Sequence, residues 1–392
     1  MSVTDVPGFV ASGSSAGIKK SGEPDLAILA TDDNQPVTAA GIFTKNKLTA
    51  APVVVSKAHL AESAGKASAV VINSGNANAA TGERGLDDAT TMCRETAQGL
   101  GVEANHVLVC STGGIGFPLP MDAISPGIQK GVEALDAAGG VEAATAMMTT
   151  DTVPKHTLVT GTDANGVEFS VGGIAKGAAM LEPNMATMLA VVTTDAKVGP
   201  AEATLMLQRG AGPAFNSLTI DGAQSTNDTV LLLANGKAGH VEQTALQASI
   251  DQVLLDLAIQ MADDAEGSTK TVFVDVKGAA DQLDATAVAR GIANSQLIKC
   301  SWYGQDPYWG RVASEAGVRA NAFDPATLTI KYGDHAVYKN GQPTNPDASG
   351  LKATMAERQI VLTVDLGQGP AATRVITTDL APGYIDENKG TS

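Results

Sequence analysis

The stretch KGAAMLEPNMATMLAVVTTDA, residues 176–196, places a threonine at the border between a loop and a buried strand. Pro183 and Asn184 are residues typical of a turn. From Thr187 onward the run TMLAVVTT is apolar on both faces, which predicts a strand buried on both sides. Thr187 is therefore expected at the end of a sheet, where the strand begins. It could be simply the first residue of the strand, or it could be a nucleophile. On this pattern alone, the strand-starting interpretation is the simpler one.

The nucleophile interpretation requires a base, because a threonine hydroxyl reacts poorly until its proton is removed. The stretch 176–196 contains no histidine. Cleavage of the chain just before Thr187 would supply a base, because a new α-amine has a pKa of about 7.7–8.0 in model peptides. The reactive form would then be a threonine at the start of a new chain.

The composition predicts a packed globular protein of the α/β or α+β class. Of the 392 residues, 44% are hydrophobic and 17% are charged, which disfavours disorder. Segments with strand character alternate with helical segments such as 86–101, and Asn165-Gly166 indicates a hairpin. The net charge of −16 disfavours nucleic acid or an anionic membrane as partner, because the basic surface that they require is missing.

The sequence predicts neither a metal site nor a bound cofactor. The five histidines are spread out, and no glycine-rich motif for binding phosphates is found. The three cysteines are scattered, the start shows no secretory signal, and no apolar run approaches the roughly 20 residues that a membrane helix needs. We therefore expect a cytoplasmic protein.

Three polar loops are candidate parts of a site. In STGGIGFPLP, residues 111–120, the backbone N–H groups of Thr112 and Gly113 could converge on an oxyanion, or the glycines could simply allow a tight turn. The asparagines of INSGNANAATG, residues 72–82, favour a rigid loop over direct chemistry. The segment IDGAQSTNDTV, residues 220–230, is ambiguous in the same way.

Several segments together resemble the ornithine acetyltransferase (glutamate N-acetyltransferase) family of arginine biosynthesis. The resemblance runs from GFVASGSSAGIKKSG near the start to the last dozen residues and covers nearly the whole chain. Its segments occur in the order STGGIGFPLPMD, MMTTDTVPK, VGGIAKGAAMLEPNMATMLA, STNDTVLLLANG, DAEGSTK, DPYWGRV and GYIDEN.

The resemblance implies an acyltransferase that cleaves itself between Ala186 and Thr187. Two fragments, residues 1–186 and 187–392, would be intertwined in one α/β body and would assemble as an α2β2 heterotetramer. Thr187 would take an acetyl group from N-acetylornithine and pass it to glutamate, without a cofactor but with acetyl-CoA as a further acetyl donor to be considered. The implied fold is an αββα sandwich that resembles the N-terminal-nucleophile hydrolases but differs in connectivity.

The resemblance also assigns roles to individual residues. Thr112 and Gly113 match the oxyanion-hole positions. Four positions match substrate-binding residues: Thr149, Lys176, Glu266 and Asn388. The chain ends in NKGTS, which departs from the family's usual tail, so that Ser392 is the expected but least regular substrate contact.

Three other functions stay open from the sequence. An amidase or aminopeptidase could use the same threonine with water as acceptor. A paralogous acyltransferase could act on related acylated amino acids. A non-catalytic protein could bind an acylated amino acid without turnover.

Overall fold

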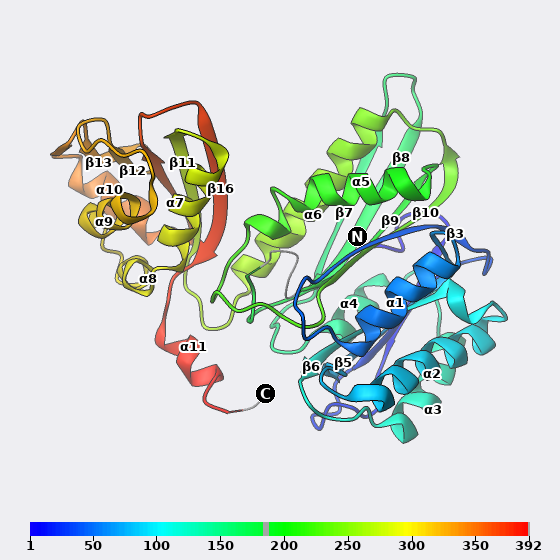
Figure 1. Ribbon diagram of the computed structural model, residues 1–392. Coiled ribbons are helices and arrows are strands. Elements are labelled where there is room, and N and C mark those ends of the chain that lie inside the picture. Colours follow the sequence, from blue (N-terminus) through cyan, green and yellow to red (C-terminus); the bar gives the residue numbers. More distant parts are fainter. Residues whose placement is uncertain (183–187, 391–392) are drawn as a thin grey trace. The chain divides into compact units, whose positions relative to one another are not determined.

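The computed structural model describes residues 1–182 and 188–390, and Figure 1 shows the course of the chain. The predicted cleavage pair Ala186 and Thr187 and the predicted substrate contact Ser392 lie outside the described residues. The chain forms two compact units, one from residues 1–216 and 223–261, the other from residues 217–222 and from 262 onward. The predicted division after residue 186 is a cleavage of the chain and not a boundary between compact units. It stays a prediction.

The first sheet of the first unit has the order β1-β2-β5-β6. Its strands are β1 (Phe9–Ser14), β2 (Leu26–Thr31), β5 (Ala69–Asn76) and β6 (Val107–Gly114). β5 and β6 are parallel, whereas the other neighbours are antiparallel. The strand predicted to end at Cys110 therefore continues to Gly114, because Thr112 and Gly113 pair with Ser74 and Gly75 of β5.

The second sheet of this unit has the order β4-β3-β10-β9-β8-β7. Its strands are β4 (Lys66–Ala67), β3 (Val37–Phe43), β10 (Thr229–Gly239), β9 (Leu189–Ala196), β8 (Glu168–Lys176) and β7 (Lys155–Thr162). Every residue of β9 is buried, as the apolar run after Thr187 predicts. The predicted hairpin joins β7 to β8, and Gly166 has a φ of 82° in its turn.

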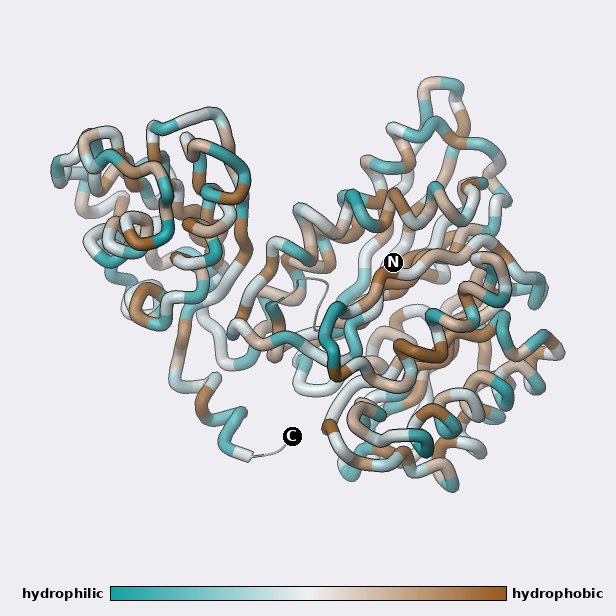
Figure 2. The backbone as a smooth tube through the Cα atoms, in the orientation of Figure 1, coloured by the Kyte–Doolittle hydropathy of each residue, from teal (hydrophilic) through white to brown (hydrophobic). Residues whose placement is uncertain are grey.

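The two sheets of the first unit pack face to face. One core joins Ile72 and Leu108 of the first sheet to Val191 and Leu231 of the second, and Figure 2 shows these strands as hydrophobic stretches. Helix α4 (Gly140–Met147) adds Ala143 and Met147 and their neighbours to the same core. Since apolar faces of two sheets bury each other, the layers are held together mainly by aliphatic side chains.

Helices cover the outer faces of both sheets. Those next to the first sheet are α1 (Ala51–Glu62), α2 (Gly82–Leu100) and α3 (Met121–Glu133), and a second core joins their side chains to Ile28 and Val71. Those next to the second sheet are α5 (Pro200–Ala211) and α6 (Gln243–Asp263). Val253 and Leu257 of α6 approach Gly173 of β8 so closely that a Cβ there would lie 2.7 and 2.9 Å from them. The predicted α/β class with an αββα sandwich is therefore confirmed.

The second unit contains one mixed sheet of order β14-β13-β12-β15-β11-β16. Its strands are β11 (Thr271–Ala279), β12 (Thr329–Tyr332), β13 (His335–Lys339), β14 (Gln342–Pro343), β15 (Gln359–Asp365) and β16 (Ala371–Thr378). Its helices are α7 (Gln282–Asn294), α8 (Gln296–Tyr303), α9 (Trp309–Arg319), α10 (Ala348–Ala356) and α11 (Pro382–Glu387). The fully buried Trp302 donates through Nε1 to the Tyr332 hydroxyl at 3.3 Å in its core.

One helix is shorter than the sequence predicts. The pattern of residues 202–216 predicts a helix throughout, but α5 ends at Ala211 and the chain continues through Gly212 and Pro213 into a short 3-10 turn at Phe215–Ser217. Glycine and proline stop the helix at this point. Within residues 1–182 and 188–390, no helix has both the length and the apolar character needed to cross a membrane.

Candidate active site

Three neighbouring strands place residues around the start of β9. Lys176, the last residue of β8, lies opposite Leu189, the first residue of β9. Leu189 also lies opposite Thr229, the first residue of β10, and the Thr229 amide donates to the Met188 carbonyl at 3.1 Å. Because Met188 follows Thr187 in the sequence, Lys176 and Thr229 flank the described residues that come directly after the predicted nucleophile.

Lys176 belongs to a polar cluster, which we call the lysine cluster: the half-buried Thr149 and the buried Asp151, Lys155 and Lys176. Lys176 Nζ donates to Thr149 Oγ1 at 2.6 Å and lies 3.5 Å from Asp151 Oδ2. Asp151 Oδ1 accepts from Lys155 Nζ and from the Gly177 amide, each at 2.7 Å. The structure thus brings together Thr149 and Lys176, two predicted substrate-binding residues, and adds Asp151, which the sequence analysis did not single out.

The negative charge of the lysine cluster lies on Asp151. Burial alone would raise the pKa of Asp151, but the ammonium groups of Lys176 and Lys155 hold it well below its usual range. Asp151 is therefore ionised at neutral pH and contacts both lysines. The Lys155 side chain is fully buried, whereas the Lys176 side chain keeps 9% of its surface exposed. The partly exposed ammonium of Lys176 suits a substrate carboxylate.

We predict that Asp151→Asn destabilises the protein strongly. Asparagine would remove the carboxylate that contacts the ammonium groups of Lys155 and Lys176, and breaking a buried ion pair by removing one partner typically costs about 3–5 kcal/mol of unfolding free energy. Urea unfolding followed by circular dichroism measures this change. Asp32→Asn is the matched control, because Asp32 pairs with Lys237 at 2.8 Å while both side chains are more than 40% exposed. That control should cost less than about 1 kcal/mol, and equal losses in the two variants would contradict the role given to Asp151.

Lys19 lies close to both the lysine cluster and the end of β5. Its Cγ is 3.2 Å from the point where a Cβ on Gly75 would stand. Its Nζ donates to the Pro24 carbonyl at 2.7 Å. Burial lowers the pKa of Lys19, an effect partly offset by acidic neighbours that include Asp151. Lys19 is therefore a further cation on this side of the first unit.

The ends of β5 and β6 approach each other unusually closely. Gly113 has a φ of 128° and Gly75, opposite it, has a φ of 95°. A Cβ on Gly113 would lie 2.3 Å from the carbonyl carbon of Gly75, so only glycine fits. Thr112 is half-buried and Gly113 is exposed, so the predicted oxyanion-hole residues lie at the surface end of the strand. The positive φ expected for a tight turn is present, but within a strand end rather than a loop.

Asparagine side chains donate hydrogen bonds to backbone carbonyls of the loops next to β5, β6 and β10. Asn227 Nδ2 donates to the carbonyls of Ala77 at 2.6 Å and Ser111 at 2.9 Å. Asn76 Nδ2 donates to the Pro118 carbonyl at 3.0 Å. The two ambiguous asparagine segments thus have the structural role that the sequence favoured for 72–82, and Asn227 ties the loop before β10 to the residue before Thr112.

Two further predicted substrate-binding residues, Glu266 and Asn388, lie in the second unit. Asn388 Nδ2 donates to Glu266 Oε2 at 2.6 Å, so these two residues are in direct contact. The Tyr384 hydroxyl donates to Asp221 Oδ2 at 3.3 Å, and burial together with Asp221 and Glu266 raises the pKa of Tyr384 to about 12. Burial and acidic neighbours also raise the pKa of Glu387. The acidic side chains around Tyr384 have the charge that suits the ammonium group of a substrate.

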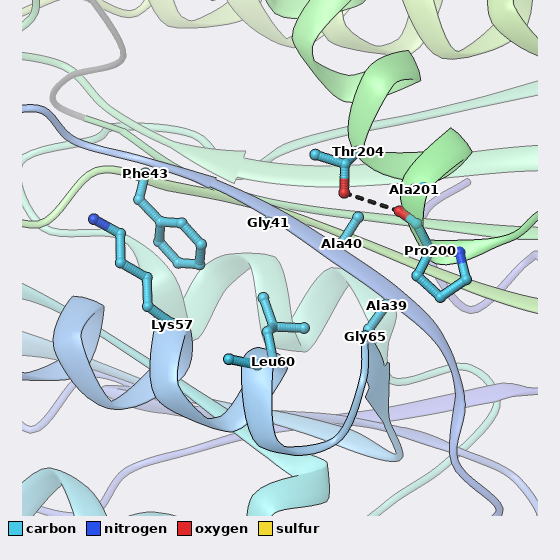
Figure 3. A pocket seen from close by; sticks show the side chains of 11 residues that line it. Ala39, Ala40, Gly41, Phe43, Lys57, Leu60, Gly65, Pro200, Ala201 and Thr204 are labelled. Carbon is cyan, nitrogen blue, oxygen red and sulfur yellow. Dashed lines mark hydrogen bonds between the residues drawn. The ribbon is translucent and has the colours of Figure 1, made fainter.

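Two surface hollows are lined by residues other than the predicted site residues. The first, of about 320 Å³, lies between β3, α1 and α5 and is lined by residues such as Gly41, Phe43, Leu60 and Pro200 (Figure 3). The second, of about 660 Å³, is lined by Thr38, Lys197 and Lys237 among others. Among residues 1–182 and 188–390, no group of three or more His, Cys, Asp and Glu side chains is arranged to hold a metal ion.

Comparisons with known proteins identify the relatives of this chain. The model of the ArgJ family matches residues 10–390. An arginine biosynthesis bifunctional protein from Mycobacterium leprae is 45% identical, and the match covers 100% of this chain and 95% of the relative. One from Symbiobacterium thermophilum is 41% identical, with 98% and 97% covered. The chain belongs to the ArgJ family.

A solved structure is also similar to this chain. A structure described as ornithine acetyltransferase complexed with ornithine, from Mycobacterium tuberculosis, is 40% identical, covers 47% of this chain and 95% of its own, and has a TM-score of 0.44. Membership of the ArgJ family confirms the resemblance found in the sequence and, with it, the prediction that the chain is an acyltransferase enzyme of arginine biosynthesis.

Two residues of this ArgJ chain were missed by the sequence analysis as site candidates: Lys19 and Asp151. They lie within two segments that carry the family resemblance, GSSAGIKKSG and MMTTDTVPK. Both are ionisable side chains that are partly or wholly buried, and this burial results from contacts between distant parts of the chain. A pattern of local residues does not show such burial.

Proposed function

We propose that this chain is a self-cleaving N-acetylornithine:glutamate N-acetyltransferase in which Thr187 is the nucleophile. The observation that carries the proposal is the lysine cluster, whose Lys176 lies opposite Leu189, the first residue of the strand that follows Thr187. A cation near a nucleophilic threonine would hold the carboxylate of an amino-acid substrate while its acyl group is transferred.

Self-cleavage would begin when Thr187 Oγ attacks the carbonyl carbon of Ala186. The hydroxyl loses its proton, the peptide C–N bond breaks, and the nitrogen of Thr187 gains a proton and becomes the new α-amine. Water then hydrolyses the Ala186 ester, which releases residues 1–186 and restores the hydroxyl. The freed amine is the base for every later turnover.

Acetyl transfer would follow in two steps. Thr187 Oγ attacks the acetyl carbonyl of N-acetylornithine, ornithine leaves, and the amine of glutamate then takes the acetyl group from the acetyl-threonine ester. Both steps pass through a tetrahedral oxyanion, for which Thr112 and Gly113 are the proposed donors. Thr149 and Lys176 would hold the substrate carboxylate. We assign Glu266, Asn388 and Ser392 to the remaining substrate contacts.

The assembly and surroundings belong to the same proposal. The two fragments would assemble as α2β2 and act in the cytoplasm without nucleic acid, membrane or bound cofactor. Acetyl-CoA would be tested as a second acetyl donor, because an enzyme that uses it could also start arginine biosynthesis.

One assay tests the proposed reaction. Purified protein is incubated with labelled glutamate and either N-acetylornithine or acetyl-CoA, and N-acetylglutamate is measured by mass spectrometry. The proposal predicts product from N-acetylornithine, with parallel-line kinetics of a double-displacement reaction. Release of acetate from N-acetylornithine that is unaffected by glutamate would identify a hydrolase instead, and transfer only to other amines would identify a paralogous acyltransferase.

A further inference from the structure

Helix α11 leads directly to Asn388, yet it buries none of its own residues. Its one large aliphatic side chain, Ile385, is 62% exposed. Burial of an apolar face is what usually holds a helix in place. Because α11 lacks such a face, a small number of other contacts must position it. These contacts are made with the turn at residues 265–268 and with Asp221, all within the second unit.

Two glycines bring the backbone of α11 against the turn at residues 265–268. A Cβ on Gly383 would lie 2.9 Å from the Gly267 Cα, and a Cβ on Gly267 would lie 2.2 Å from the Tyr384 nitrogen. Gly267 also has a φ of 61°, which favours glycine. Because Glu266 is the residue before Gly267, this close approach also sets how far Glu266 lies from α11.

A tyrosine ties α11 to a second part of the unit. The Tyr384 hydroxyl donates to Asp221 Oδ2 at 3.3 Å. The segment that carries Asp221 is itself fixed, because the Thr219 amide donates to the Ile376 carbonyl at 2.8 Å and Thr219 Oγ1 donates to Asn294 Oδ1 at 2.6 Å. Asp221 is therefore a firm anchor for the first turn of α11.

The Asn388 side chain is fixed by two hydrogen bonds. Its Nδ2 donates to Glu266 Oε2 at 2.6 Å and to the Tyr384 carbonyl at 2.9 Å, so both amide hydrogens are used. Among the described residues, Glu266 Oε1 and Asn388 Oδ1 make no hydrogen bond. An ammonium group has three donors and no acceptor. The pair thus offers one charged and one neutral acceptor to a substrate ammonium.

We propose that Gly383 and Tyr384 are positioning residues for the side-chain end of the acetyl donor, because they hold α11 where Asn388 meets Glu266. The inference rests on the proposed function, in which Glu266 and Asn388 contact the substrate. When α11 is displaced, the two acceptors separate. The apparent affinity for the donor then falls with the fraction of molecules in which α11 is in place, whereas acetyl transfer from a bound donor is unchanged.

The test measures KM and kcat of the full-length protein for N-acetylornithine at saturating glutamate. Tyr384→Phe removes only the hydroxyl and should raise KM by about three- to tenfold, as expected when one hydrogen bond is lost. Its kcat should stay close to that of wild type. Gly383→Ala should raise KM at least as much, because the new Cβ would meet the backbone of Gly267, which cannot yield as a flexible side chain does.

Tyr303→Phe and Gly304→Ala are the matched controls. Tyr303 lies in the same unit, is 44% exposed, and has a hydroxyl that makes no hydrogen bond within the described part of the chain. A Cβ on Gly304 would have its nearest contact at 3.5 Å, which is an ordinary distance. Both controls should have wild-type KM and kcat. Circular dichroism shows which of the variants are folded.

A double variant separates positioning from a general structural role. Glu266→Gln removes the charge that would bind the ammonium, so it should raise KM for N-acetylornithine by itself. Adding Tyr384→Phe to Glu266→Gln should raise KM little further, because both changes act on the same contact. If the two effects on KM multiply instead, Tyr384 does not act through Glu266, and the proposal is overturned.

The outcomes separate the inference from the function on which it rests. A folded Tyr384→Phe variant whose KM rises by less than about threefold, or whose kcat falls while KM is unchanged, would overturn the positioning role alone. If Gly383→Ala does not fold, Tyr384→Phe decides. Glu266→Gln with wild-type KM would overturn the substrate role of Glu266 and the inference with it. A wild-type protein that transfers no acetyl group from N-acetylornithine would overturn the proposed function itself.

Discussion

Thr187→Ala should leave the purified protein as a single chain of 392 residues that transfers no measurable acetyl group. The substitution removes the hydroxyl that must attack Ala186 in the precursor and the acetyl carbonyl in the mature enzyme. Denaturing electrophoresis measures the first loss, and the glutamate acetylation assay measures the second. This is the largest effect we expect, because one oxygen atom serves both reactions.

Thr187→Ser is the control for this variant. Serine keeps the hydroxyl and, after cleavage, would carry the same adjacent α-amine, so it should still cleave and transfer acetyl groups, at a reduced rate. A Thr187→Ala chain that splits after residue 186, or that acetylates glutamate from N-acetylornithine, would contradict the assignment of the nucleophile.

Gly113→Ala should lower kcat/KM for acetyl transfer by at least about 100-fold, which is the typical loss when one oxyanion donor is displaced. The new Cβ would lie 2.3 Å from the Gly75 carbonyl carbon and 2.5 Å from the Asn76 nitrogen. Backbone atoms of a paired strand do not yield as a flexible side chain does, so the ends of β5 and β6 must separate. The φ of 128° at Gly113 is also strained for alanine.

Gly116→Ala separates the position of the oxyanion hole from general strain at glycine. Gly116 lies three residues further along and has a φ of 90°, but a Cβ there would meet no atom within 4 Å. Alanine at this position should cost about 1–2 kcal/mol of stability and leave acetyl transfer close to wild type. If Gly113→Ala were as active as Gly116→Ala, Thr112 and Gly113 would not form the oxyanion hole.

The sequence predicted those parts of the fold whose cause is local. The apolar run after Thr187 predicted β9, and Asn165-Gly166 predicted the turn between β7 and β8, because both depend on side chains within a few residues. The order of the strands could not be predicted in this way. β10, for example, lies between β3 and β9 because of contacts among segments nearly 200 residues apart.

For the candidate site, the sequence predicted positions but not the charges around them. The family resemblance implied that Thr149 and Lys176 bind substrate, which stays a prediction, and the structure places Lys176 Nζ 2.6 Å from Thr149 Oγ1. The charge of Lys176 alone would favour the neutral form of a nearby α-amine by repulsion. Asp151 lies 3.5 Å from Lys176 Nζ and compensates part of that charge, which the sequence did not indicate.

The most direct test of the account is the intact mass of purified wild-type protein, combined with sequencing of each new N-terminus. The account predicts two fragments, residues 1–186 and 187–392, the second beginning with an unblocked Thr187. An active preparation in which the bond between Ala186 and Thr187 is still whole would contradict it.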